Sequence, residues 1–190
     1  MAEREKRAAV FLDRDGVLNV YLPGDYVKTP GDLRLLPGVA QVVRTFNNAQ
    51  IPVFIISNQQ GVAKGLMTLD DLDRVDDALK INLAESAGAH IEESYYCPHA
   101  SQAGCDCRKP QSGLLLRAAR DWDVNLSDSV FIGDTETDAQ AARAAGVGAF
   151  VLVLTGKHTD AETFQEQADY IANDLRDAAE WVLTRRKAAG

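Results

Sequence analysis

The sequence predicts an α/β fold, a Rossmann-like three-layer sandwich in which a mostly parallel central sheet lies between two layers of helices. One observation and one rule of chain topology lead to this prediction. Short apolar runs alternate along the chain with longer segments whose apolar residues recur every three or four positions, the pattern of strands alternating with amphipathic helices. Crossovers between neighbouring parallel strands are right-handed, which places helices on both faces of the sheet.

Length and composition agree with one domain over residues 1–190. Of the 190 residues, 46% are apolar and 25% are charged. A chain of this length removes about 70% of its unfolded surface from water, so it can form a core without disulfide bonds. No run approaches the ~20 apolar residues of a membrane span, and the charged N-terminus lacks a signal-peptide core. We therefore expect a cytoplasmic monomer with no membrane partner.

The charge balance indicates what kind of partner the protein has. The net charge of −8 has the wrong sign for attraction to phosphate backbones, so nucleic acid is not expected as a partner. An anionic substrate would have to be attracted by a local basic cluster or by a bound cation.

The N-terminal half is predicted to contain a strand, a helix, a second strand and a long second helix. The apolar run 8–12 is the first strand, and it leads into an Asp-Arg-Asp-Gly turn. Apolar residues at helical spacing follow over 39–46, and 53–56 is the next strand. Thr68, with an aspartate three residues later, begins the long helix through a capping box, and Gly88 ends it.

The C-terminal half continues the alternation. Strands are predicted over 91–97, 129–132, 150–154 and 170–172. Between them Ser112 caps one helix and Gly146 ends another, and Asn173 is predicted to cap the last helix.

Polar side chains follow three of the predicted strands. The first strand leads to Asp13 and Asp15, the second to Ser57 and Asn58, and the strand at 129–132 runs into Asp134. Open parallel sheets bind ligands outside the carboxyl ends of their strands. We therefore expect the chemistry of the protein at this edge of the sheet.

Asp13 and Asp15 are predicted to form a carboxylate pair. In an extended chain, residues two apart point to the same side, whereas Arg14 between them points away. Together with Asp134 they supply the hard oxygen ligands that Mg²⁺ prefers. A carboxylate that faces a phosphoryl group can act as a nucleophile, the role we expect for Asp13, while Asp15 serves as general acid and base.

Two aspartates before a glycine also occur in ordinary turns, where they hydrogen-bond their own backbone. Here an apolar strand precedes them, and a Ser-Asn strand end, the segment 108–110 (Arg-Lys-Pro) and Gly133-Asp134 follow. This context favours the catalytic interpretation over an ordinary turn.

These four segments resemble the motifs of the haloacid dehalogenase-like (HAD) phosphatases. They are VFLDRDGVLN at 10–19, IISN at 55–58, RKP at 108–110 and IGDTETD at 132–138, so the resemblance covers residues 10 to about 155. It implies a HAD-like fold and phosphomonoester hydrolysis through an aspartyl-phosphate on Asp13, with Asp15 as acid and base.

The same resemblance implies a ligand set. Ser57 and Lys109 would bind the phosphoryl group. Mg²⁺ would be bound by Asp13, Asp134 and the main-chain carbonyl of Asp15, with Asp138 in the outer shell.

A second cluster of ligand-type residues lies at 97–107. Cys97, His99, Cys105 and Cys107 can close a tetrahedral Zn²⁺ site. The alternative is a reduced, metal-free thiol cluster; a disulfide would leave one of the three cysteines over. Four protein ligands leave no open position for catalysis, so the expected role of zinc is to fix the loop that precedes the Arg-Lys pair.

This loop narrows the resemblance to the capless HAD branch that contains heptose-bisphosphate and histidinol-phosphate phosphatases. The segments between the motifs are too short for a lid, so loops would recognise a small phosphorylated sugar or similar metabolite. Further candidate substrate-binding residues are Asn58, Gln59, Lys64 and Arg108. Removal of the 7-phosphate of a heptose bisphosphate is the first expectation, and histidinol phosphate is the alternative substrate. A zinc-stabilised binding module without turnover is the alternative of a different class.

Overall fold

The computed structural model describes residues 6–157 and 166–189. Its strands are β1 (Val10–Leu12), β2 (Val53–Asn58), β3 (Glu93–Cys97), β4 (Val130–Gly133), β5 (Ala149–Val153) and β6 (Tyr170–Ala172). Its helices are α1 (Val39–Asn48), α2 (Leu69–Ala87), α3 (Gly113–Asp121), α4 (Glu136–Ala145) and α5 (Leu175–Ala189), with the short 3-10 helices η1 (Pro30–Asp32) and η2 (Leu126–Asp128). The six strands form one sheet in the order β3-β2-β1-β4-β5-β6, and every neighbouring pair is parallel.

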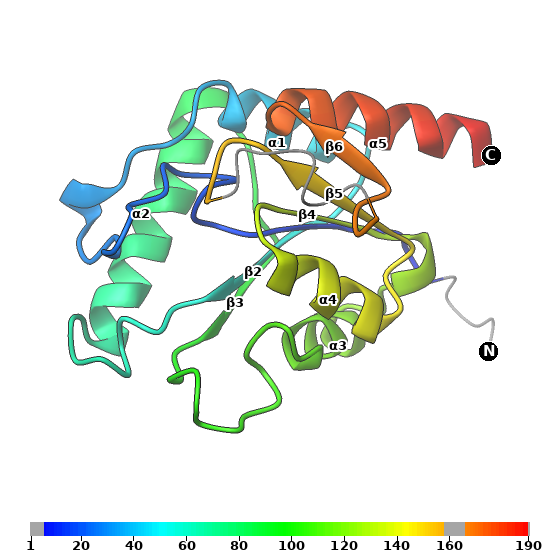
Figure 1. The fold of residues 1–190 in the computed structure, drawn as a ribbon. Coiled ribbons are helices and arrows are strands. Elements are labelled where there is room, and N and C mark those ends of the chain that lie inside the picture. Colours follow the sequence, from blue (N-terminus) through cyan, green and yellow to red (C-terminus); the bar gives the residue numbers. More distant parts are fainter. Residues whose placement is uncertain (1–5, 158–165, 190) are drawn as a thin grey trace.

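Helices cover both faces of this sheet, so the predicted three-layer sandwich is confirmed. Helices α1, α2 and α5 lie on one face, and α3 and α4 lie on the other (Figure 1). The strands supply both cores by alternation. In β1, Val10 and Leu12 pack in the first core and Phe11 packs in the second.

The second core is built around aromatic rings. The ring centroids of Phe11 and Phe54 lie 5.6 Å apart, and the ring of Trp122 meets Phe54 edge-on at 5.5 Å. Phe131 and Phe150 form a further edge-on pair at 6.1 Å. The first two contacts join β1 and β2 to the loop after α3, and the third joins β4 to β5. They support the strands whose ends form the site.

The ends of the long helix α2 are those that the sequence predicts. The Thr68 hydroxyl accepts a hydrogen bond from the Asp71 backbone N–H at 3.1 Å, and the Asp71 carboxylate accepts one from the Thr68 backbone N–H at 2.8 Å. Gly88 ends the helix in the left-handed conformation, with φ +62°.

The prediction that Asn173 caps the last helix is wrong, because Asp174 does so. The Asp174 carboxylate accepts a hydrogen bond from the backbone N–H of Asp177 at 2.9 Å, which is the capping geometry for a helix that begins at Leu175. Asn173 instead donates from its own backbone and side-chain amides to Asp177.

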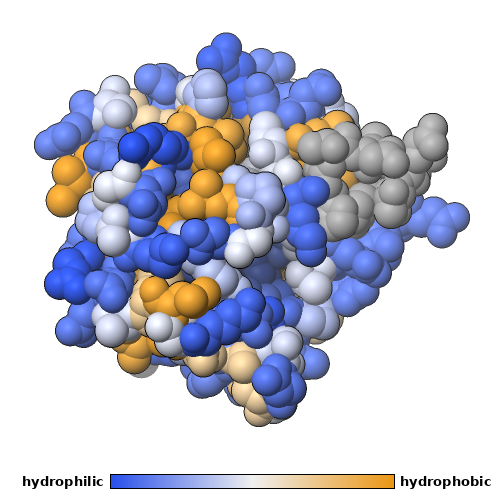
Figure 2. Space-filling view, turned by 60° about the vertical axis from the view of Figure 1, so that its left-hand side comes forward, coloured by the Kyte–Doolittle hydropathy of each residue, from blue (hydrophilic) through white to orange (hydrophobic). Residues whose placement is uncertain are grey.

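No cap domain is inserted in the described part of the chain. Between β1 and β2 the chain forms loops, η1 and α1, and between β2 and β3 it forms a loop and α2. None of the described helices combines the length and the apolar character needed to cross a bilayer. The face of the molecule in Figure 2 is mostly hydrophilic, with a few apolar patches.

Candidate active site

The carboxyl ends of β1 and β4 bring together carboxylates that are distant in sequence. Because Leu12 pairs with Ile132, Asp13 and Asp134 leave the sheet side by side. Carboxylate oxygens of Asp13, Asp134 and Asp138 lie within 4.8 Å of one another, and all three residues are buried. Asp138, which the resemblance placed in an outer shell, therefore lies within the cluster.

Lys109 supplies positive charge to this cluster. Its ammonium lies 3.0 Å from Asp13 Oδ1 and 2.5 Å from Asp138 Oδ1, and it donates to the Ile56 carbonyl at 2.8 Å. Burial lowers the pKa of Lys109, but the two carboxylates outweigh burial, so the net shift is upward and the ammonium stays charged. The lysine is only 3% exposed, so its ammonium is shielded from bulk solvent.

Three buried carboxylates share this single ammonium, which leaves an excess of negative charge. Burial, followed by the charges of Asp13 and Asp138, raises the pKa of Asp134 to about 8. Burial also raises the pKa of Asp13, to about 6, against the opposing charge of Lys109. Asp134 Oδ1 is buried and has no hydrogen-bond partner among the described residues. A hard divalent cation would neutralise this charge and use this lone pair, so the residues fit Mg²⁺.

Two glycines allow the chain to approach Asp134 closely. A Cβ on Gly16 would lie 2.5 Å from Asp134 Oδ2, and one on Gly156 would overlap the same oxygen. Gly16 also has φ +90°, a conformation that other residues rarely adopt. The backbone N–H of Lys157, next to Gly156, donates to Asp134 Oδ2 at 2.7 Å. The carboxylate is thus held in one orientation.

Asp15 faces a different set of groups. Its carboxylate accepts hydrogen bonds from Arg14 Nη2 at 3.0 Å, Asn19 Nδ2 at 2.9 Å and Gln59 Nε2 at 2.8 Å. Burial raises the pKa of Asp15, but the charge of Arg14 and these hydrogen bonds outweigh burial, and the net shift is downward. The resting site therefore holds Asp15 as a carboxylate.

The prediction that Arg14 points away from both carboxylates is wrong. It assumed extended geometry, but the chain turns directly after β1. The backbone N–H groups of Leu18 and Asn19 both donate to the Arg14 carbonyl, at 2.8 and 3.1 Å. The turn brings the Arg14 guanidinium against the Asp15 carboxylate.

The end of β2 contributes three polar residues with different contacts. Ser57 is 2% exposed and lines the cavity above the carboxylates. Asn58 also lines it, and its side chain binds the Lys109 backbone in both directions, with two hydrogen bonds of 3.0 Å. Gln59 is fully buried and lies outside the cavity lining, where it donates to Asp15 and to Ser57.

The cavity at this edge of the sheet has a volume of about 210 Å³. Of the predicted substrate-binding residues, Arg108 lines it and Lys64 does not; the Lys64 ammonium lies 3.1 Å from the hydroxyl of Tyr26, which lines the cavity itself. The remaining lining residues are of two kinds. Thr135 and Thr137 belong to the segment 132–138, which begins at the end of β4. The others lie in loops that no motif marks: Tyr21, Leu22, Asp25, Val27 and Lys157.

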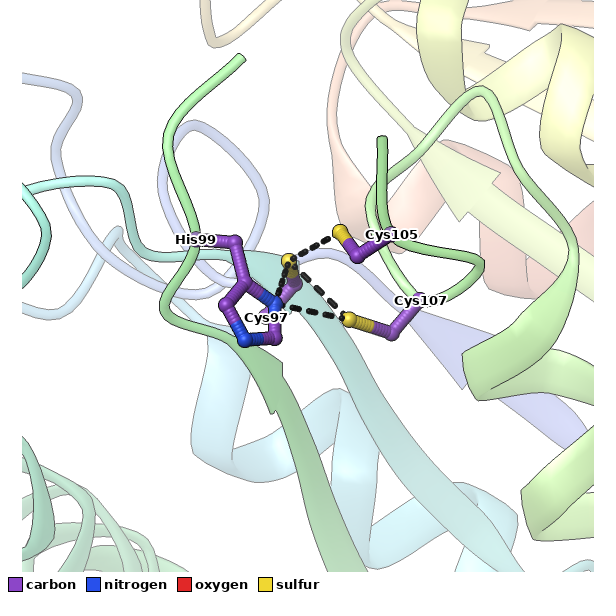
Figure 3. Close-up of side chains that lie close together, drawn as sticks. All are labelled: Cys97, His99, Cys105 and Cys107. Carbon is purple, nitrogen blue, oxygen red and sulfur yellow. Dashed lines mark hydrogen bonds between the residues drawn. The ribbon is translucent and has the colours of Figure 1, made fainter. Parts of the chain in front are cut away.

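The four zinc-type ligands meet beside this site. Figure 3 shows the side chains of Cys97, His99, Cys105 and Cys107 pointing toward one another. Cys97 Sγ lies 3.7 Å from Cys105 Sγ and 3.3 Å from Cys107 Sγ, and His99 Nδ1 lies 3.2 Å from Cys107 Sγ. Adjacent ligands around a tetrahedral Zn²⁺ with ~2.3 Å Zn–S bonds are about 3.7 Å apart. The four residues therefore fit a closed zinc site, and none of the cysteines forms a disulfide.

Comparisons with known proteins agree with this geometry. The HAD-hydrolase-like family model matches residues 106–178. The chain is 41% identical to D-glycero-D-manno-heptose-1,7-bisphosphate 7-phosphatase of Thermosynechococcus vestitus, covering 94% of this chain and 96% of that protein. It is 34% identical to D-glycero-beta-D-manno-heptose-1,7-bisphosphate 7-phosphatase of Escherichia coli K12, covering 95% and 96% of the two chains.

A solved structure extends the similarity to three dimensions. It is that of D,D-heptose 1,7-bisphosphate phosphatase from B. bronchiseptica, complexed with magnesium and phosphate. The TM-score is 0.87 at 33% identity, over 94% of this chain and 99% of the other. Similarity of this extent over nearly the whole length means that the chain belongs to the haloacid dehalogenase-like phosphatases.

Proposed function

We propose that this phosphatase removes the 7-phosphate of D-glycero-D-manno-heptose 1,7-bisphosphate or of a closely related sugar phosphate, with Asp13 as nucleophile. One observation carries the assignment of Asp13. Its carboxylate lines the cavity, beside Lys109 on one side and Asp134 on the other. The relatives that are 41% and 34% identical to this chain over nearly its whole length are named for this activity.

The first chemical step transfers the phosphoryl group to the protein. An Asp13 carboxylate oxygen attacks phosphorus, the bond from phosphorus to the sugar oxygen breaks, and that oxygen takes a proton from the Asp15 carboxyl. The resting site holds Asp15 ionised, and the negative charge of an entering phosphoryl group favours its protonation. Ser57 and Lys109 hold the phosphoryl oxygens while negative charge builds up.

The second step releases phosphate. The Asp15 carboxylate takes a proton from water, the water oxygen attacks phosphorus, and the bond to Asp13 breaks. Asp15 has then regained the proton that it gave up in the first step. The nucleophile and the general base thus have separate surroundings, the first beside Lys109 and the second beside Arg14.

Mg²⁺ is the cofactor that fits the carboxylate cluster, and its proposed ligands are Asp13, Asp134 and the Asp15 carbonyl. When bound, it neutralises the charge between substrate and site and polarises the phosphoryl group. Asp138 holds Lys109 in place from the other side of the cluster.

Zn²⁺ is proposed at Cys97, His99, Cys105 and Cys107. Arg108 follows the last of these ligands directly and donates to the carbonyl of His99 at 3.3 Å. The metal therefore fixes the loop that presents Arg108 and Lys109 to the cavity, within what we propose is a single domain over residues 1–190.

Replacing the nucleophile tests the proposal. The Asp13→Asn variant keeps the size of the side chain but cannot form the covalent intermediate, so phosphate release from the heptose bisphosphate should fall at least about 10³-fold. Mg²⁺-dependent release of inorganic phosphate measures this, with circular dichroism as the check on folding. Turnover within tenfold of the unsubstituted protein, in a folded variant, would contradict the role of Asp13.

A substrate panel separates the remaining alternatives. The heptose bisphosphate should give the highest kcat/KM among sugar phosphates, sugar bisphosphates and histidinol phosphate. A preference for histidinol phosphate would support the alternative substrate. Absence of Mg²⁺-dependent hydrolysis across the panel would support a binding module instead.

A further inference from the structure

Arg14 is the largest fully buried side chain among the described residues, and it lies directly beneath the site. Its Nη2 contacts both oxygens of the Asp15 carboxylate, at 3.0 and 3.3 Å, and donates to the Gln59 side-chain carbonyl at 3.0 Å. Gln59 in turn donates to Asp15 at 2.8 Å. The three side chains form a closed triangle in which the carboxylate has one orientation.

The rest of the guanidinium packs against an aromatic ring. Arg14 Nε and Nη1 have no hydrogen-bond partner within the described chain, and the guanidinium carbon lies 5.7 Å from the ring centroid of Tyr96. A desolvated cation over an aromatic face is attracted to the ring, which offsets part of the cost of its burial. The guanidinium is thus in contact with the ring as well as with Asp15 and Gln59.

Tyr96 is itself anchored from below. Its hydroxyl donates to the Asp76 carboxylate at 2.6 Å, and Ser94 donates to the same oxygen at 2.8 Å. The other oxygen of Asp76 pairs with the Lys80 ammonium at 2.8 Å. A continuous series of contacts therefore connects helix α2, through Tyr96 of β3 and then Arg14, to Asp15.

A buried arginine in this position is costly for stability alone. Desolvation of a guanidinium costs several kcal/mol, and an apolar side chain of similar length would fill the same space without that cost. Both of its polar partners belong to the surroundings of the site: Asp15 is the proposed acid and base, and Gln59 also contacts Ser57. The geometry therefore indicates a role in the reaction.

We propose that Arg14 is a positioning residue, which together with Gln59 and the ring of Tyr96 holds the Asp15 carboxylate in the orientation needed for proton transfer. The inference rests on the proposed function of this site. No hydrogen bond or ion pair joins the Arg14 side chain to Asp13, Lys109 or Asp134, and the Arg14 backbone N–H, which donates to Asp13 Oδ1 at 2.8 Å, remains when the side chain is replaced. Replacing the side chain should therefore slow the proton transfers and leave the attack of Asp13 on phosphorus largely intact.

Substrates with different leaving groups separate these two effects. Loss of a sugar alkoxide requires a proton from Asp15, whereas p-nitrophenolate leaves without one, so the first turnover of p-nitrophenyl phosphate needs only the nucleophile. Hydrolysis of the aspartyl-phosphate needs the base with either substrate. A rapid burst of nitrophenolate followed by slow turnover is thus the signature of a displaced Asp15.

The test compares Arg14→Met with Arg120→Met, an exposed control, by stopped-flow and steady-state assays. Loss of positioned proton transfer costs about 10²-fold or more, so in Arg14→Met the turnover of the sugar phosphate and the steady-state turnover of the aryl phosphate should fall by about that factor. The burst rate should stay within about threefold of that of the unsubstituted protein, and the control should behave like that protein.

Two results would overturn the inference: unchanged turnover of the sugar phosphate, or burst and steady-state rates that fall by the same factor. If Arg14→Met does not fold, Arg14→Lys is read by the same criteria, because a lysine keeps the buried positive charge but lacks the planar guanidinium that contacts Asp15 and Gln59 and lies against the Tyr96 ring. Failure of the proposed function is distinguishable, since the unsubstituted protein would then fail to hydrolyse the sugar phosphate.

Discussion

At the scale of single residues, the site depends on how charge is shared among three buried carboxylates and one ammonium. The charge of Asp134 is the least compensated of the three, because its Oδ1 has no partner among the described residues and its pKa is raised to about 8. A carboxyl group whose pKa is higher in the folded than in the unfolded state contributes stability that is fully present below its unfolded pKa. That contribution is lost as the pH rises toward 8.

We therefore expect Asp134→Asn to stabilise the protein in the absence of Mg²⁺. At pH 8 its Tm should exceed that of the unsubstituted protein by at least about 4 °C, and the difference should shrink as the pH falls toward 4. Added Mg²⁺ should raise the Tm of the unsubstituted protein alone. Thermal melts at several pH values, in buffer without chelator so that zinc stays bound, measure both effects. A lower Tm for the variant at pH 8 would contradict this account of Asp134.

Only some of the contacts between single residues of the site could be predicted from the sequence. The proximity of Asp13 and Asp134 could be predicted, because parallel strands end at the same edge of the sheet. The contact of Arg14 with Asp15 could not be predicted, because the Asp-Arg-Asp-Gly pattern indicates a turn but does not fix the directions in which its side chains point. Nor could the approach of Gly156 to Asp134, which joins two distant loops.

At the scale of secondary structure elements, the loop from Cys97 to Arg108 decides how the basic residues reach the cavity. It begins at the end of β3, and its own cysteines and histidine hold it closed. Hydrogen bonds from the Asn58 side chain to the Lys109 backbone tie the following residues to β2. The loop is thus fixed at both ends, by the ligand cluster and by the neighbouring strand.

Removal of one ligand should loosen this loop. Cys105→Ser should lower the zinc content from one ion per chain to near zero, measured by plasma mass spectrometry, and should reduce kcat/KM by about 10- to 100-fold, since outer contacts tune a site by this factor. Ser101→Ala, in the same loop but outside the ligand set, is the matched control. Zinc loss without loss of activity would show that the metal does not position Arg108 and Lys109.

The ends of the helices were predictable to different degrees. Thr68 and Gly88 mark the ends of α2 because capping and left-handed termination are local properties of the chain. Asn173 and Asp174 are both competent caps, so local preference does not choose between them. The backbone of the following turn places Asp174 at the N-cap position.

At the scale of the whole molecule, the sheet carries the site between two separate cores. The second, aromatic core holds Phe54 at zero exposure between Phe11 and Trp122, on one face of the strands that end in the proposed catalytic residues. The other core packs the same strands against α1, α2 and α5. The positions of the strand ends therefore depend on packing on both faces.

Phe54→Ala should cost about 3–5 kcal/mol of unfolding free energy, because it leaves a cavity in the aromatic core. Urea denaturation measures this, and Leu116→Ala, at a position that is 46% exposed, should change stability by less than about 0.5 kcal/mol. Activity well below the melting temperature should be retained in both variants. A cost below about 1 kcal/mol for Phe54→Ala would mean that the core closes around the missing ring.

The sequence by itself determined the alternation of strands and helices, the parallel sheet, and the strand ends that carry the carboxylates. These follow from hydrophobic periodicity and from local capping and turn preferences, which depend on neighbouring residues only. The tertiary structure alone decided that Asp138 lies within the carboxylate cluster and pairs with Lys109, that Gln59 lies outside the cavity lining, and that Arg14 contacts Asp15. Such contacts join residues far apart in the chain or across an irregular turn, and their energies depend on burial and on mutual charge, which exist only once the chain has folded.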